Sequence, residues 1–283
     1  MHDPGVLRVG TVPYLVGRPL DSGLGEEEGV ELVEAVPARL VDGLREGSLD
    51  VALVSSIELF RREGYAYLPG MAVSGRGAVA SVQLFLRRPV EELATVALDP
   101  SSRTAATLVR VLLAERADGG PEFVEVPVGE DPRAAGCDGW LRIGDEALRE
   151  VAAADAPPVF NPSQQWCART GLPFVFAAWI VRPGVDATPW LAAFERARAR
   201  GTAAIAELAA QAADAWNLSL PFCLHYLAEE CVYEALPDMH AALVAFRDAA
   251  APLGLCTADS DPAVVGGFHP PAGDFAPAPC HRD

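Results

Sequence analysis

Short apolar segments alternate with amphipathic helical segments along the first 60 residues, and this alternation most limits how the chain can fold. Pro37 stands where a helix would begin, a position that tolerates proline because its missing N–H needs no partner there. Strands that are separated by helices favour a parallel sheet with helices on its faces. The predicted strands are 7–12, 30–36 and 50–54, and the predicted helices are 18–24 and 38–45.

A second series of the same kind begins near residue 92. Its predicted strands are 95–98, 122–126 and 139–143, with a long amphipathic helix after the turn 99–102 and another helix opening at Asp145. Apolar strands 81–87 and 174–181 flank this series, and the chain is helical and alanine-rich after residue 189. We therefore predict an α/β fold of two hinged lobes with an inter-lobe cleft. The larger, discontinuous lobe takes 1–88 and 174–256, the smaller lobe 89–173, and 257–283 form a flexible tail.

The charge balance argues against two classes of partner. With 22 basic and 39 acidic residues the formal net charge is −17, and every basic residue is arginine. Such a chain repels phosphate backbones and anionic lipid headgroups, so neither nucleic acid nor a membrane surface is an expected partner. The first residues lack a secretory pattern and no apolar run is long enough to span a bilayer, which makes a cytoplasmic location the expectation.

No metal site is expected. The six cysteines are scattered, and only His225 near Cys223 and His281 beside Cys280 suggest ligands. Two such ligands do not complete a tetrahedral shell. The sequence also shows no pattern of a Ser-His-Asp triad and no nucleophile elbow, so a covalent hydrolase is disfavoured.

Hydroxyl residues gather where the predicted strands end and helices begin. At such ends free N–H groups meet ligands, so several hydroxyl-rich helix starts facing one cleft favour anion binding. The alternative is that these residues only cap their helices. Without a glycine-rich phosphate loop, the expected ligand is a small carboxylate. The candidate residues at these ends are Tyr14, Ser55, Ser56, Ser102, Arg103, Thr104, Gly144 and Asp145.

Charged candidates near these ends have two interpretations each. Arg18 and Arg103 either hold the ligand's negative charge or form surface salt bridges. A further helix is predicted to begin after Ser55 and Ser56. Glu58, one turn into it, faces either solvent or the cleft.

Several segments together resemble the chorismate dehydratases of menaquinone biosynthesis by the futalosine pathway. The matching segments run collinearly over about residues 7–250. They are Val12-Pro13-Tyr14-Leu15 with Arg18-Pro19-Leu20, Val36-Pro37-Ala38-Arg39-Leu40, Gly47 to Glu58, Ser81-Val82-Gln83-Leu84-Phe85, Ser101-Ser102-Arg103-Thr104, Arg142-Ile143-Gly144-Asp145 and Thr170 to Trp179.

This resemblance implies a fold like type II periplasmic solute-binding proteins and a cofactor-free dehydration of chorismate to 3-[(1-carboxyvinyl)oxy]benzoate. The substrate carries two carboxylates, and losing water makes its ring aromatic. The protein would orient the substrate, assist proton removal and help hydroxide to leave. The resemblance makes Ser81 the candidate catalytic residue, because it matches a family serine in a Ser-Val-x-Leu-Phe strand.

The chain departs from the family pattern at Val16. The family has Asn there, in Tyr-Leu-Asn-x-x-Pro-Leu, and valine can neither donate nor accept a hydrogen bond at a bound substrate. A second departure is Asn161-Pro162-Ser163, before the matching Trp166. Two other functions therefore stay open: a non-catalytic binder of chorismate or a related carboxylate, and 1,4-dihydroxy-6-naphthoate synthase, whose usual Ser-Pro-Cys-Pro-Asn-Asp segment this chain lacks.

Overall fold

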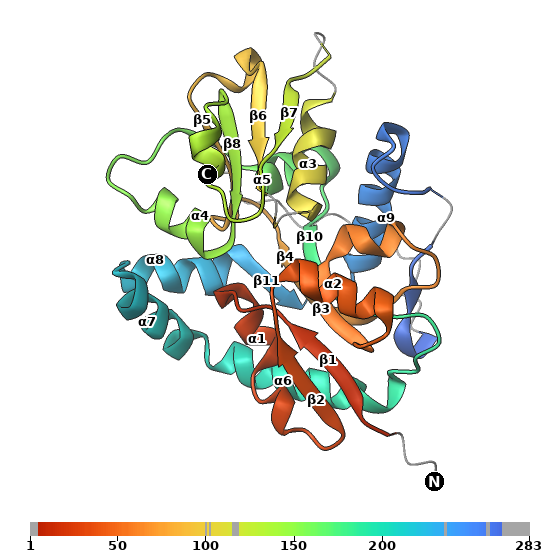
Figure 1. Ribbon diagram of the computed structural model, residues 1–283. Coiled ribbons are helices and arrows are strands. Elements are labelled where there is room, and N and C mark those ends of the chain that lie inside the picture. Colours follow the sequence, from red (N-terminus) through yellow and green to blue (C-terminus); the bar gives the residue numbers. More distant parts are fainter. Residues whose placement is uncertain are drawn as a thin grey trace.

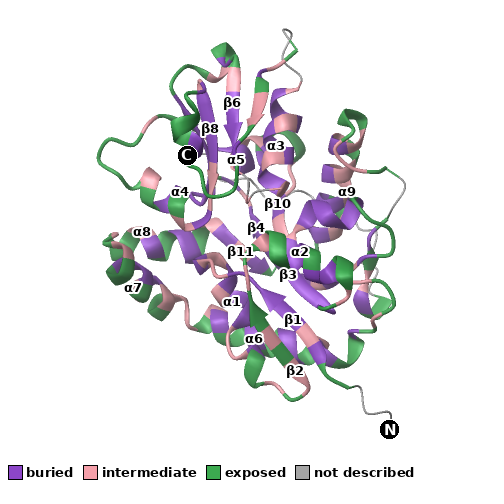
Figure 2. Cartoon of the chain, in the orientation of Figure 1, coloured by how far each residue is buried: buried purple, intermediate pink, exposed green. Residues whose placement is uncertain are grey.

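Two β-sheets form the framework of the computed structural model, which describes residues 5–99, 101, 103–114, 119–234, 237–258 and 261–267. Figure 1 shows one sheet in the lower half of the molecule and the other in the upper half, with helices packed around both. The inner strands of both sheets are largely buried, whereas the edge strand Val30–Glu34 and the outer faces of the helices are exposed (Figure 2). This is the expected two-lobed α/β fold.

The first sheet has the order β11-β4-β10-β3-β1-β2, with β12 beside β4. The predicted parallel pairing holds for β1 with β2 and with β3, but β10 runs antiparallel to both β3 and β4. The sheet is therefore mixed rather than parallel. Its strands are β1 (Leu7–Thr11), β2 (Val30–Glu34), β3 (Val51–Ser55), β4 (Ala66–Gly75), β10 (Phe174–Val181), β11 (Cys231–Glu234) and β12 (Ala263–Val264).

The second sheet has the order β7-β6-β8-β5-β9 and is buried on both faces. Alternate residues of β5 enter different clusters, since Leu84 packs in one and Phe85 in the other, as the period of a strand requires. Arg87 and Arg133 lie over the Trp140 ring on the second of these faces. The strands are β5 (Val82–Leu86), β6 (Thr95–Leu98), β7 (Glu122–Glu125), β8 (Gly139–Ile143) and β9 (Val159–Phe160).

Helices from distant parts of the chain pack together beside the first sheet. Helix α6 lies against α1, so the C-terminal half of the chain returns to the lobe that the N-terminus builds (Figure 1). No helix among the described residues is both long and apolar enough to cross a membrane. The helices are α1 (Arg18–Asp21), α2 (Pro37–Glu46), α3 (Arg103–Leu113), α4 (Gly144–Val151), α5 (Pro162–Thr170), α6 (Leu191–Ala203), α7 (Ile205–Trp216), α8 (Leu220–His225) and α9 (Met239–Ala250).

Strand β4 is central to the first sheet, yet the sequence pattern does not predict it. The segment contains Pro69 and Gly70, which normally mark a turn. Here they lie in a bulge, because the pairing with β10 skips from Ala72 to Tyr67 and Gly70 has φ +70°. A proline and a glycine are tolerated in a strand at such a bulge.

Three further expectations differ from the structure. The stretch predicted as helical over 220–235 ends in strand β11, after a π-helical turn at Tyr226–Glu230. Strand β5 belongs to the second sheet, so the sheets change over near residue 81, before the predicted lobe boundary at 88. Part of the predicted tail, Ala263–Val264, forms β12 beside β4, and residues 268–283 lie outside the described residues.

Candidate functional site

A cleft lies between the two sheets, with about 650 Å³ of space when its opening to solvent is included. The walls are mainly apolar and carry a few hydroxyl groups. The lining residues are Val12, Tyr14, Val16, Pro37, Leu53, Val54, Ser55, Val73, Ser81, Val82, Ser101, Thr104, Ala105, Ile143, Gly144, Phe176 and Ala177.

Both lobes deliver their lining residues from the carboxyl ends of strands, as expected for an open α/β sheet. Tyr14 follows β1 and Ser55 ends β3 in the first sheet, whereas Ser101 follows β6 and Gly144 follows β8 in the second. Ser81 lies in the crossing segment before β5 and is 5% exposed. Six of the predicted site residues thus share the cleft: Tyr14, Val16, Ser55, Ser81, Thr104 and Gly144.

Ser55, the last residue of β3, and Ser56, the next residue, do not cap a helix with their side chains. The turn Ser56–Phe60 is a 3₁₀ helix without a side-chain cap. Ser56 is fully buried and donates to the Val175 carbonyl over 2.6 Å, so it lies behind the cleft wall rather than in it. Ser55 is left facing the cleft. Capping therefore explains neither serine.

The two candidate arginines do not line the cleft. Arg18 pairs with Glu34 over 2.6 Å, and Arg103 pairs with Glu58 over 2.9 Å. Of the two interpretations, the structure shows the salt bridges; contact of either arginine with a ligand stays a prediction. Ser102, another candidate, lies outside the described residues.

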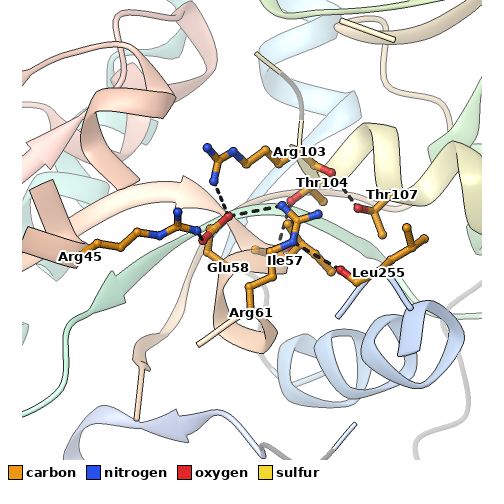
Figure 3. Close-up of polar contacts among 9 residues, drawn as sticks. Arg45, Ile57, Glu58, Arg61, Arg103, Thr104, Thr107 and Leu255 are labelled. Carbon is orange, nitrogen blue, oxygen red and sulfur yellow. Dashed lines mark hydrogen bonds and ion pairs between the residues drawn. The ribbon is translucent and has the colours of Figure 1, made fainter. Parts of the chain in front are cut away.

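Glu58 faces neither solvent nor the cleft, against both expectations. It is 1% exposed, and its carboxylate forms ion pairs with three arginines (Figure 3). These are Arg45 at 2.7 Å, Arg61 at 3.5 Å and Arg103 at 2.9 Å. Since Arg103 begins α3 beside the second sheet, this cluster ties the two lobes together. The next residue, Thr104, adds a second tie by accepting from the Ile57 N–H over 3.2 Å.

Asp145 forms a contact between the lobes on the side of α4. Its carboxylate accepts from the Leu15 N–H over 3.3 Å. Burial raises the pKa of this carboxyl to about 6, although that hydrogen bond opposes the shift. Asp145 is not a lining residue of the cleft, but it adjoins Gly144, which is.

Tyr14 is the lining residue best suited to donate a hydrogen bond. Burial raises the pKa of its phenol, and the charge of Asp99 raises it further, while a hydrogen bond with Ser101 lowers it. The hydroxyl therefore stays protonated at neutral pH. Gly144 packs beside this ring, and its φ of +63° lies in the left-handed region that favours glycine.

Phe176 is a lining residue that the sequence analysis does not select. It lies in β10, at an irregularity of the pairing with β4 between Val175 and Ala177. Such an irregularity redirects a side chain and leaves no signal in apolar periodicity, so the run 174–181 looks like an ordinary buried strand.

A family model described as menaquinone biosynthesis matches residues 7–252. The chain belongs to this family. It is 32% identical to the chorismate dehydratase of Thermus thermophilus over 260 positions, which cover 84% of this chain and 95% of that protein. It is 30% identical to the chorismate dehydratase of Campylobacter jejuni over 164 positions, 58% of each chain.

Solved structures support the fold. A protein from Archaeoglobus fulgidus matches with a TM-score of 0.69 at 17% identity, covering 90% of this chain and all of that one. The alkanesulfonate-binding protein of Xanthomonas axonopodis matches with a TM-score of 0.62 at 16% identity, covering 90% and 96%. The fold is therefore similar to that of periplasmic binding proteins.

Proposed function

We propose that this protein is a chorismate dehydratase, which removes water from chorismate to form 3-[(1-carboxyvinyl)oxy]benzoate for menaquinone biosynthesis in the cytoplasm. The observation that carries the proposal is the near full-length match to the Thermus enzyme, together with a cleft built from the segments that resemble that family. No cofactor enters the reaction. Among the described residues, no group of three or more His, Cys, Asp or Glu could hold a metal ion.

Hydroxyl groups would hold the two substrate carboxylates. Ser55, Ser81, Thr104 and Tyr14 line the cleft from both lobes, whereas the hydroxyl of Ser101, also in the lining, already donates to Asp99. A carboxylate that accepts several hydrogen bonds needs no arginine to be bound. Contacts from both lobes also fix the ring between them, and orientation of this kind is a large part of catalysis.

The described lining holds no carboxylate, imidazole or amine. A general base must remove the proton from the ring carbon bearing the ether, and a serine hydroxyl without a partner is a poor base. Desolvation in the apolar cleft raises the basicity of any carboxylate bound there. We therefore assign the base to a carboxylate of the substrate, the polarising contact to Ser81 and the donor for the departing hydroxide to Tyr14.

The second candidate, a non-catalytic binder of chorismate or a related carboxylate, rests on Val16. This residue lines the cleft, so the amide expected from the family pattern is missing from the wall itself. The polar neighbours Arg18 and Ser56 cannot replace it, because both are turned to other partners. Tyr14 and Ser55 are the described hydroxyl residues of the first sheet that line the cleft.

Incubation with chorismate tests the proposal, with chromatography and mass spectrometry of the products. We expect wild-type protein to convert chorismate into an aromatic product that has lost one water. Ser81→Ala should lose about a hundredfold or more in kcat, the usual scale for one transition-state contact. Ser48→Ala is the matched control, because Ser48 bonds only the Gly43 carbonyl, away from the cleft. Chorismate that binds but stays unchanged would support the binder instead.

A further inference from the structure

The crossing segment that carries Ser81 is held by a turn from the far end of the chain. Residues Tyr226–Glu230 form a single π-helical turn between α8 and β11. Such turns are rare and concentrate at functional sites, because the wider turn redirects side chains that an α-helix would point elsewhere. The cleft lining does not include this turn.

Glu230 binds the backbone next to Ser81. Its Oε2 accepts from the Ala80 N–H over 2.6 Å, and its side chain is 15% exposed. This is a charge-assisted hydrogen bond to a loop amide, stronger than one between neutral groups. The Ser81 carbonyl in turn accepts from the Gly144 N–H over 2.8 Å, so the backbone of this segment is fixed on both sides.

The turn that carries Glu230 is itself anchored in the fold. Tyr226, at its start, is 1% exposed, and Cys231, directly after it, pairs with Gly75 of β4. The contact of Glu230 with Ala80 therefore holds the crossing segment against a fixed part of the first lobe.

We propose that the π-helical turn is a positioning device for Ser81, in which Glu230 fixes the backbone next to this residue. This inference rests on the proposed function, because it makes Glu230 act on the reaction only through Ser81. Glu230 is not among the residues that line the cleft.

A double-mutant cycle tests the role of Glu230. Glu230→Gln should lower kcat several-fold with little change in KM, because a charge-assisted hydrogen bond becomes a weaker, neutral one. In a Ser81→Ala background the same change should have no further effect, because its target is gone. An equal loss of kcat in both backgrounds, or no loss in either, would overturn the proposal.

Amide exchange tests Glu230 without reference to activity. In Glu230→Gln the Ala80 amide should exchange with solvent about tenfold faster and kcat should fall several-fold. Glu234→Gln should leave both unchanged, because Glu234 is exposed and pairs with Arg198 instead. Unchanged Ala80 exchange in Glu230→Gln would contradict the inference.

The two proposals fail in different ways. A wild-type protein that converts no chorismate defeats the proposed function. The positioning inference is then judged on Ala80 exchange and on the affinity for chorismate by calorimetry, which Glu230→Gln should weaken in wild type but not in Ser81→Ala. Normal turnover with no coupling between residues 230 and 81 defeats the inference alone.

Discussion

At the scale of single residues, the cleft depends on which polar groups are already paired. Arg18, Arg103 and Ser56 have the right chemistry for a carboxylate but bind Glu34, Glu58 and the Val175 carbonyl. Sequence position alone could not separate them from Ser55 and Thr104, because the pairing partners come from other parts of the chain. Side-chain partners, rather than residue type, decide which groups are left for a ligand.

Val16 gives the sharpest prediction at this scale. Val16→Asn should raise kcat for chorismate by about ten- to a hundredfold, because an unpaired substrate oxygen in a closed cleft costs about 1–3 kcal/mol. Val16→Leu, which fills similar space without a polar group, should give no gain. Steady-state kinetics of the three proteins measure the effect. Slower turnover in the Asn variant would show that Tyr14 already supplies the contact.

Asp145 predicts a pH dependence of stability. Its folded pKa of about 6 lies above the ordinary value of 3.8, so folding takes up a proton between these values. Its contribution to the free energy of unfolding is therefore present below pH about 4 and lost as the pH rises through about 6.

Asp145→Asn should remove this dependence. The free energy of unfolding of the variant minus that of wild type should therefore be roughly 1–3 kcal/mol larger at pH 7 than at pH 4. Denaturant unfolding at both pH values measures the difference. Glu130→Gln, at an exposed position whose charge does not act on Asp145, is the control. An equal difference between variant and wild type at the two pH values would contradict the assigned burial.

At the scale of elements, the packing of α6 on α1 depends on Gly201. A Cβ at this position would lie 2.4 Å from the Pro19 carbonyl oxygen, a backbone atom that cannot move alone. Gly201→Ala should therefore cost about 1–3 kcal/mol in the free energy of unfolding, despite the better helix propensity of alanine. Ala199→Ser, exposed on the same helix, should stay within about 0.5 kcal/mol of wild type. A Gly201→Ala protein as stable as wild type would show that the helices can separate.

Glu58 gives a second prediction for the elements. Glu58→Gln leaves three arginines without their shared carboxylate and should destabilise the protein by about 2–4 kcal/mol. Because Arg103 belongs to α3, we also expect looser attachment of the second sheet, measured as faster amide exchange around Ile57, whose N–H donates to Thr104. Loss of stability without change at Ile57 would confine the cluster to the first lobe.

Most strands with regular apolar patterns could be predicted from the sequence, including β1, β6 and β10. Strands β4 and β11 could not. In β4 a bulge accommodates Pro69 and Gly70, and in β11 the strand follows directly on a helical segment with no breaker between them. Both depend on pairing with distant strands, which local patterns do not contain.

At the scale of the whole molecule, the chain builds one lobe from its two ends and the other from its middle. Hydroxyl groups from both lobes, including Ser81 and Thr104, therefore reach one cleft although they lie far apart in sequence. The rule that strand ends gather ligand groups was enough to predict this convergence. It could not predict the apolar walls, since Phe176 and Val73 look like ordinary core residues.

A crystal structure of the Ser81→Ala protein with chorismate tests the central claim most directly, since the variant should bind the substrate without consuming it. The account predicts chorismate between the lobes, with its carboxylates on Ser55 or Thr104 and its ring hydroxyl within hydrogen-bond distance of the Tyr14 hydroxyl. Chorismate bound elsewhere, or a cleft that stays empty at saturating chorismate, would contradict it.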